Sequence, residues 1–408
     1  MAKKVDEERF RVDTADPVAR FVTDRLGLDW HVVLLIALIV YGPIEKILIP
    51  GLLGYRHLDF EFPMKTWIPD IEALLTGFVV FPFFFAYYIW SGRGLGLVFM
   101  RLERAEIFGD RQQYRQFWTR ARSCFNHRSL WIIALVLSVA AMAFWQLVVW
   151  KPTAAVAPWF DLSYDPDFQR FAYLYGRQPF ARVLSILLIG CVAYAFVQVV
   201  IREALALYWL TKLWDEMEEN IVVHPYHHDD AGGMGGVGRH ALQLSALVGF
   251  VLVFIVMGSF LPALRVPLVN VTLAGLPRVL DGSLVGFWIL YFVFLGWAIR
   301  PLFLRPHELM CRARDRRVDV VSKELNELIE RQQQAVSGGS EDLESISKRI
   351  DELKKVRSQI IEDAPVWPFT MELRIKLGLT SLPALLLPAA KLGLQKGFDQ
   401  LVNMVTKS

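Results

Sequence analysis

The run VLSILLIGCVAYAFVQVVIREALALYW, residues 183–209, carries a single charged pair, Arg202-Glu203, close to its end. A helix of about 20 apolar residues crosses a hydrocarbon core of about 30 Å, so the run predicts a transmembrane helix. Because no helix breaker follows before Glu219, we expect one long helix that continues beyond the membrane. Arg202 lies about 28 Å from Val183 along the helix axis. Its side chain is therefore predicted to snorkel to the inner interface.

Five further runs of this kind predict a polytopic membrane protein. Of the 408 residues, 54% are hydrophobic and 21% are charged. A domain with this composition would be poorly soluble in water. A net charge of +3 is too small to indicate nucleic-acid binding. The predicted fold is all-α, a six-helix transmembrane bundle with cytosolic helical extensions and a C-terminal helical hairpin. The predicted spans are 32–49, 71–90, 130–150, 183–209, 241–264 and 284–304.

The connections differ in their content of lysine and arginine, and basic residues next to spans are retained in the cytosol. Residues 91–129 hold eight arginines, whereas the connections on the opposite side are poorer in basic residues. Both termini are therefore expected in the cytosol. The predicted parts are a cytosolic N-terminal segment 1–30, a six-span domain 31–304 with cytosolic loops 91–129 and 211–240, a cytosolic helical hairpin 305–363, and an interfacial or re-entrant segment 364–408.

Few polar or ionisable side chains fall inside the predicted spans. Glu45 and Lys46 lie in the first span, and Gln146 and Gln198 lie in the third and fourth. Such groups are costly in a bilayer and often mark a polar pathway, so these four residues are candidates for lining a pore. In the alternative interpretation, Pro43 ends the first helix early and both charged side chains snorkel to the outer interface.

The second span leads into a basic amphipathic segment. Pro82 lies in the middle of the span and predicts a kink, and SGRG at residues 91–94 is expected to break the helix. Arg93, Arg101 and Arg104 then follow among apolar residues and are candidates for binding anionic lipid on the inner leaflet. The alternative is a packed pair of cytosolic helices whose arginines only mark the cytosolic side.

The sequence HPYHHDDAGGMGGVGRH, residues 224–240, holds the densest potential chemistry. Imidazole and carboxylate groups are good ligands for zinc and other divalent metals, although the spacing matches no HExxH, CxxC or EF-hand motif. A structural loop that caps the fifth helix and a pH-responsive switch are the alternatives. The candidate metal ligands are His224, His227, His228, Asp229 and Asp230.

Gly233, Gly235 and Arg239 form a second candidate site in the same loop. The glycines read GxGxxG, but a transmembrane helix is expected to follow instead of a βαβ unit, which argues against dinucleotide binding. Glycines at a helix start expose N–H groups to which an anion or a lipid phosphate can dock. We therefore predict that these three residues bind lipid or another anion.

The same stretch resembles an HPxHxDxxGGxGxxG segment of uncharacterised polytopic membrane proteins from bacteria. The resemblance covers residues 224–238. It implies no function and no residue roles. What it adds is the expectation of a multi-pass protein of the bacterial inner membrane.

Two apolar stripes after the sixth span predict a helical hairpin. Leucine, isoleucine and valine recur at 3-4-3 spacing on both sides of Gly338-Gly339. Each stripe is short for an independent coiled coil, so the helices are expected to pack on each other or on a neighbouring subunit. Residues 311–362 are the candidate contact for a cytosolic protein partner. Residues 377–390 are apolar but short, which favours a re-entrant or interfacial piece over a seventh span.

Three functions from different classes fit these features. The first is an oligomeric pore or channel-like effector regulated through its cytosolic face, because apolar constrictions need no buried charge. The second is a membrane sensor or adaptor that couples to a cytosolic partner through the hairpin. The third and least favoured is a metal-dependent hydrolase with Asp230 as general base, so enzymatic activity is left open but not favoured. Membrane lipid and further copies of the chain are the expected partners, without nucleic acid.

Overall fold

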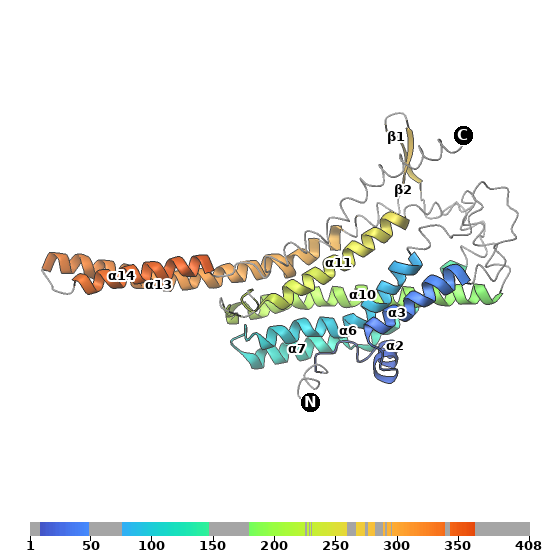
Figure 1. Ribbon diagram of the computed structural model, residues 1–408, viewed down its shortest axis with the longest axis horizontal. Helices are drawn as coiled ribbons and strands as arrows, with labels where there is room; N and C mark the ends of the chain where they lie inside the picture. Colours follow the sequence, from blue (N-terminus) through green and yellow to red (C-terminus); the bar gives the residue numbers. More distant parts are fainter. Residues whose placement is uncertain are drawn as a thin grey trace.

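The computed structural model of the protein is built mainly of long helices (Figure 1). It describes residues 9–48, 76–146, 179–224, 227, 229, 231–258, 267–273, 276–281, 289, 292–294, 296–338 and 343–363. The α-helices are α2 (Pro17–Arg20), α3 (Trp30–Ile39), α6 (Phe81–Arg104), α7 (Arg111–Phe125), α8 (Arg128–Trp145), α10 (Pro179–Met217), α11 (Gly235–Gly258), α13 (Arg305–Gly338) and α14 (Leu343–Asp363). Shorter π-helical or 3-10 segments are η1 (Phe21–Arg25), η2 (Val40–Leu48), η4 (Thr76–Val80), η7 (Glu218–Asn220) and η9 (Arg300–Leu304).

The 39-residue helix α10 is the central element of the helix bundle, with α6 and α8 packed along it. Gly190 of α10 permits the close approach of α8, because a Cβ at this position would overlap the side chain of Met142 on α8. The Ser138 hydroxyl donates a hydrogen bond of 2.6 Å to the carbonyl oxygen of the same glycine. The prediction that the fourth span continues as one long helix is confirmed.

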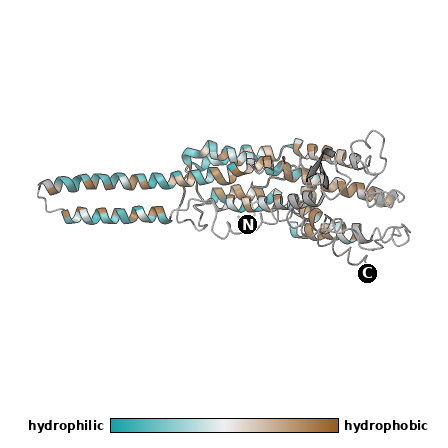
Figure 2. Cartoon of the chain, turned by 90° about the horizontal axis from the view of Figure 1, so that it is seen from above, coloured by the Kyte–Doolittle hydropathy of each residue, from teal (hydrophilic) through white to brown (hydrophobic). Residues whose placement is uncertain are grey.

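By length and composition, two helical stretches of the described residues could cross a membrane, Arg111–Ala143 and Ile186–Asn220. A third candidate consists of two parts, Pro17–Arg25 and Trp30–Ile44, bent by 106°. The surface of α8 fits an apolar environment, because large apolar side chains are exposed around it, with Val136 at 59%. A contiguous apolar surface of this kind is unusual on a protein in water. Figure 2 shows that apolar residues are concentrated in the bundle.

Helix α6 runs without interruption through residues 91–94, so the prediction that SGRG breaks the helix is wrong. Gly92 and Gly96 instead allow the N-terminal segment to lie directly on α6. A Cβ on Gly96 would overlap the carbonyl oxygen of Phe10, and one on Gly92 would overlap the Asp13 carboxylate. Pro82 lies where the π-helical segment η4 passes directly into α6, and the kink predicted there stays a prediction.

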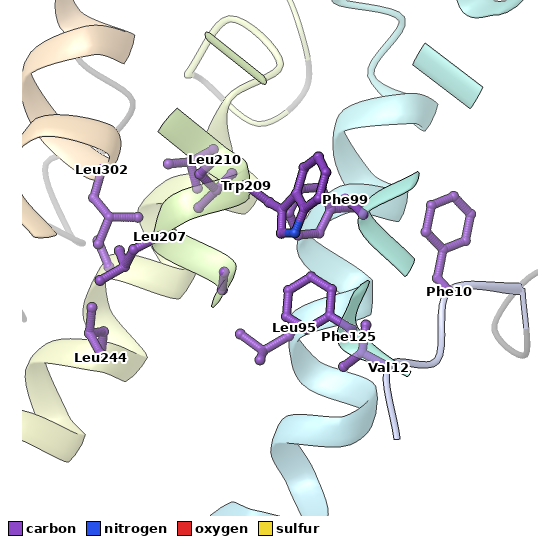
Figure 3. Packing of buried hydrophobic residues seen from close by; sticks show 14 of the residues in the cluster. Phe10, Val12, Leu95, Phe99, Phe125, Leu207, Trp209, Leu210, Leu244 and Leu302 are labelled. Carbon is purple, nitrogen blue, oxygen red and sulfur yellow. The ribbon is translucent and has the colours of Figure 1, made fainter. Parts of the chain in front are cut away.

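Residues 10–16, which we call the N-terminal strap, form part of the bundle core. The ring of Phe10 stacks on Trp118 with 5.0 Å between ring centroids. The N–H group of Val12 donates to the carbonyl oxygen of Gly92 at 3.0 Å. Figure 3 shows both strap residues beside the aromatic core. The described part of segment 1–30 is therefore integral to the bundle, and not a separate lead-in.

Helix α7 packs on α6, which supports the packed-helix interpretation of residues 91–129. The Tyr114 hydroxyl donates to the carbonyl oxygen of Phe99 at 2.6 Å. The rings of Phe99 and Trp118 lie 4.8 Å apart. Phe117 is fully buried as well. The apolar side chains of this segment are thus used for helix packing, and most of its arginines are left at the surface.

Residues 267–281 depart from the predicted all-α fold. Strands β1 (Pro267–Leu273) and β2 (Leu276–Asp281) form an antiparallel hairpin in which Leu273 lies opposite Leu276. Val269, Val271 and Leu273 alternate with polar residues, which is the period of a strand. This alternation is short and lies between two apolar runs, and the described chain is otherwise helical or in connections.

Helices α13 and α14 form the predicted helical hairpin, which we call the arm, and it projects from the bundle (Figure 1). Ile350 and Leu353 are buried between its two helices. Arg349 on α14 lies 3.2 Å from the Glu324 carboxylate on α13. The expectation that the two helices pack on each other is confirmed.

Parts of the predicted topology lie outside the described residues. They include residues 284–288, 290, 291 and 295 of span 284–304 and all of segment 364–408, with the possible re-entrant piece 377–390. In the first span, α3 continues past Pro43 as η2, so the proline does not end the helix there. Glu45 and Lys46 have their backbone in η2, and their side chains lie outside the description.

Candidate functional site

A pair of oppositely charged side chains is buried where the strap, α6 and α10 meet. Nη2 of Arg202 lies 2.7 Å from Oδ2 of Asp16, and the two side chains are 3% and 5% exposed. Nη1 of Arg202 donates to the Tyr88 carbonyl oxygen at 2.9 Å and to the Ser91 hydroxyl at 3.1 Å. A buried ion pair is stable when its remaining hydrogen-bonding capacity is satisfied, and these contacts meet that condition.

The carboxylate of Asp16 joins four elements of the fold. Because Asp16 is the N-cap of α2, one of its oxygens accepts the first free N–H groups of that helix. The same carboxylate accepts hydroxyl protons from α6 and α10. The donors are the N–H groups of Val18 (3.0 Å) and Ala19 (3.2 Å), the hydroxyls of Tyr88 (2.7 Å) and Tyr194 (2.9 Å), and the guanidinium of Arg202 (2.7 Å).

The prediction that Arg202 snorkels to the interface is wrong. That prediction used only the position of Arg202 along its own helix, and by that measure the residue is at the end of a span. The structure supplies a partner from residue 16, which the strap carries back into the bundle. The guanidinium also lies 4.9 Å from the centre of the Tyr88 ring, within cation–π range. The side chain is therefore held inside the bundle.

Glu203, the next residue of α10, belongs to a second buried polar group. Its Oε1 accepts the Tyr87 hydroxyl proton at 2.7 Å. Its Oε2 lies 3.4 Å from Nε2 of His240 on α11. Within the described part of the chain, Oε2 and both ring nitrogens of His240 lack a hydrogen bond of good geometry, and both side chains are buried. Together with Asp16 and Arg202, these residues form what we call the buried charge network.

The two halves of the buried charge network differ in their chemistry. Asp16 and Arg202 have their polar atoms occupied, so this half fixes the strap to α6 and α10. Glu203 and His240 are two proton-accepting groups at short distance, shielded from solvent, with unsatisfied atoms. Buried polar atoms without hydrogen bonds are costly, so this half of the network is held less firmly than the first half.

In the loop before α11, Asp229 holds the backbone in place. Its carboxylate accepts the N–H groups of Ala231 at 3.0 Å, Gly233 at 3.0 Å and Gly235 at 2.9 Å. Nδ1 of His227 lies 2.7 Å from the same carboxylate. Burial alone would raise the pKa of Asp229, but these donors outweigh burial and lower the pKa below its usual value. This geometry supports the structural loop that was one alternative for residues 224–240.

The predicted zinc ligands are only partly described. Among the residues with described structure, no group of three or more His, Cys, Asp or Glu side chains could hold a metal ion. Nε2 of His224 lies 3.3 Å from the carbonyl oxygen of Glu106, whereas His227 pairs with Asp229. His228 and Asp230 lie outside the described residues. Zinc binding by this loop stays a prediction.

Replacing Asp229 with alanine is expected to lower the free energy of unfolding by about 1–2 kcal/mol, the usual cost of removing a helix cap. Because the folded pKa is lowered, the carboxylate stabilises the fold fully above about pH 4 and loses this effect as pH falls through the folded pKa. Thermal denaturation in detergent from about pH 7 to about pH 3 measures the difference. Asp319→Ala, at an exposed position of α13, is the control. If Asp229→Ala lowers the stability by the same amount at every pH in this range, the ionised Asp229 carboxylate does not stabilise the loop.

Two of the predicted lipid- or anion-binding residues, Arg101 and Arg239, lie near each other. A Cβ on Gly236 would lie 3.2 Å from Cβ of Arg101, so the first turn of α11 packs on α6 at this point. Burial, together with the positive charge of Arg239, lowers the pKa of Arg101. The N–H groups of Gly233 and Gly235 already donate to the carboxylate that holds the loop. These glycines therefore offer no free donors to an external anion.

The other candidate residues are dispersed over the bundle. Arg93 is exposed and lines a small hollow with Asp29 and Trp30 at the start of α3. Arg104 is exposed in the last turn of α6. The described side chains form no common site for the three candidate arginines Arg93, Arg101 and Arg104.

The predicted pathway residues Gln146 and Gln198 lie at different levels of the bundle. Nε2 of Gln198 lies 3.4 Å from the Tyr194 hydroxyl, beside the buried charge network. Gln146 directly follows the last turn of α8. It lies about one turn beyond Met142, the residue of α8 that packs on Gly190 of α10. Gly190 itself is about 12 Å from Gln198 along α10. The two glutamines therefore do not line one constriction.

Sequence reasoning missed most of the buried charge network. One usable signal was Asp16-Pro17, because an aspartate before a proline is typical of a helix start. The other was the charged doublet Arg202-Glu203 inside an apolar run, which requires partners. No pattern relates residues 16 and 202, which are 186 positions apart. The missed residues are Asp16, Tyr87, Tyr88, Tyr194, Glu203 and His240.

The fold and the site define a helical protein with two or three candidate membrane spans and a buried charge network. No family model, no curated protein and no solved structure matches the chain. A proposal for its function therefore rests on its own geometry.

Proposed function

We propose that the protein is an integral membrane adaptor that couples its transmembrane bundle to a cytosolic protein partner through the arm. The observation that carries this proposal is the firm attachment of the arm to α10. Nε1 of Trp214 donates to the carbonyl oxygen of Pro301 at 2.8 Å. One turn further along, Arg305 lies 2.7 Å from the Asp215 carboxylate. The base of the arm is thus tied to the end of α10.

This attachment allows movement of the bundle to be passed to the tip of the arm. Helix α13 has 34 residues, and at about 1.5 Å per residue it is about 50 Å long. Arg317 adds a further tie near its base, donating to the carbonyl oxygen of Val223 at 2.7 Å. Arg202 and Glu203 lie on α10 itself. A rearrangement of the buried charge network would therefore move α10 and the arm together.

The outer part of the arm contributes nothing to the core of the bundle. Its buried residues, Ile350 and Leu353, pack within the arm, and the main apolar core contains neither of them. Val320 and Val336 are 68% and 65% exposed. A projecting helical pair that the bundle does not need for packing is best explained by a contact outside the molecule. Residues 311–362 are thus the proposed partner-binding region.

The proposed setting is the bacterial inner membrane, with six spans and both termini in the cytosol. Two or three helices have the length and composition of membrane spans. The exposed apolar surface of α8 and the basic residues of 91–129 favour the same placement. Lipid and further copies of the chain are proposed partners of the bundle, so a homo-oligomer belongs to this proposal.

The proposal is tested by a photocrosslinking amino acid placed at Val320 or Val336 in living cells. We expect an adduct with one soluble protein at these positions and none at Ile132, an exposed position of α8 that is proposed to face lipid. The same soluble protein should copurify with the intact chain and be lost on deletion of residues 311–362. Adducts with the mass of two chains only, or no adduct at either position, would refute the adaptor function. Ion current from the purified chain in planar bilayers would then favour the channel-like effector.

A further inference from the structure

The segment that follows the strap is a short helix at a sharp angle to the first candidate span. Residues 17–26, which we call the interfacial helix, comprise α2, η1 and Leu26. The helical part, Pro17–Arg25, is bent by 106° from Trp30–Ile44. If Trp30–Ile44 crosses a bilayer, the preceding helix runs close to the membrane plane. Tryptophan is enriched at the membrane–water interface, and Trp30 is the first residue of the second part.

The interfacial helix buries one face in the bundle and exposes an apolar face. Ala19 and Thr23 are buried, at 0% and 7% exposed. Val18, Phe21 and Leu26 are 41%, 51% and 51% exposed. Val18 and Phe21 are three residues apart and so lie on the same side of the helix. Half-exposed large apolar side chains beside a membrane span are suited to the boundary between headgroups and acyl chains.

The charges of this helix complement an anionic surface. Arg20 and Arg25 are exposed. The acidic residue between them, Asp24, lies 2.7 Å from Arg11, which neutralises it. The exposed charge is therefore positive. Basic residues next to a membrane surface are attracted by anionic lipids.

We propose that residues 17–26 lie in the inner leaflet, with Val18, Phe21 and Leu26 in the acyl boundary and Arg20 and Arg25 on anionic headgroups. The inference rests on the membrane insertion contained in the proposed function. Its consequence is a link between lipid and the buried charge network, because Asp16 is both the N-cap of this helix and the partner of Arg202. Lipid that holds the helix in place also holds the Asp16 carboxylate in place. The bilayer is thereby connected to α10.

Site-directed spin labelling tests this placement in the full chain. The three cysteines, Cys124, Cys191 and Cys311, are replaced, and Phe21→Cys carries the label. The protein is reconstituted in vesicles of phosphatidylethanolamine and phosphatidylglycerol. Collisions with oxygen, which concentrates in lipid, are compared with collisions with a water-soluble nickel chelate. We expect the balance at position 21 to be shifted toward oxygen, and that at the control Asp319→Cys, an exposed position of α13, to be shifted toward nickel.

A label at Val136→Cys separates failure of this inference from failure of the proposed function. If the labels at positions 136 and 21 both report water, the chain is not inserted in the bilayer and both proposals are refuted. If the label at 136 reports lipid and the label at 21 resembles the label at 319, only the interfacial helix is refuted. The anionic component is tested by replacing phosphatidylglycerol with phosphatidylcholine, which should shift position 21 toward water. The same shift is expected from Arg20→Gln combined with Arg25→Gln, and no shift in either test would overturn headgroup binding.

Discussion

Replacing Asp16 with alanine lowers the expected free energy of unfolding by about 3–5 kcal/mol, the usual result of removing one partner of a buried ion pair. The Arg202 guanidinium would stay in a site where it is 3% exposed, without its counter-charge. The hydroxyls of Tyr88 and Tyr194 would lose their acceptor, and α2 would lose its cap. Denaturation of the detergent-solubilised protein, followed by helical circular dichroism, measures the loss.

Asp24→Ala is a matched control for this change. Asp24 also pairs with an arginine, Arg11, at 2.7 Å, but its side chain is 43% exposed. Partly exposed pairs contribute less than about 1 kcal/mol. An Asp16→Ala variant that is no less stable than Asp24→Ala would contradict the structural importance of the buried pair.

The double variant Asp16→Asn with Arg202→Met separates loss of the ion pair from the presence of an unpaired charge. Replacement of a buried ion pair by uncharged groups of similar volume is often neutral. The double variant is therefore expected to be more stable than Asp16→Ala, although Arg202 is also lost. If it is instead less stable by the sum of the two single effects, the two residues act independently.

The long helices could be predicted because their signals are local. An apolar run of about 20 residues, or an apolar stripe at helical spacing, is complete within one segment. Helix α10 and the arm were predicted for this reason. The hairpin of β1 and β2 has a local signal too, but this signal is short and lies between two apolar runs whose helical signals are much stronger.

The buried charge network could not be predicted because its partners are distant in sequence. The position of Arg202 on its own helix indicates the interface, and only the strap places Asp16 beside it. Likewise His240 was assigned to a loop of histidines, whereas the fold places it against Glu203. The chemistry of these residues depends on which helices are neighbours, and no local pattern contains that information.

Gly92 and Gly96 illustrate a different limit. Glycine lowers helix propensity, so Gly92 together with Gly94 predicts a helix end. Glycine also permits another segment to approach the helix closely, and here that second property decides the structure. The two uses give the same sequence pattern, and only the presence of the strap distinguishes them.

Gly96→Ala is expected to release the strap. The new Cβ would overlap the carbonyl oxygen of Phe10, a backbone atom that cannot rotate away. Overpacking of this kind costs about 1–3 kcal/mol, which corresponds to an increase in the population of released strap of about fivefold to about 150-fold. Arg11 is 12% exposed in the folded protein, so tryptic cleavage there reports release. The control Gly296→Ala, a helical position with no heavy atom within 4 Å, should leave the cleavage rate unchanged.

Removing residues 1–12 should reverse the sign of the same substitution. Without Phe10 nothing overlaps the new Cβ, and alanine is a better helix former than glycine by about 1 kcal/mol. In the shortened chain, Gly96→Ala should therefore stabilise α6, whereas in the full chain it destabilises the bundle. Comparing the four proteins by thermal denaturation gives the coupling between strap and glycine directly. If the substitution is destabilising to the same extent in both chains, the strap does not explain the glycine at this position.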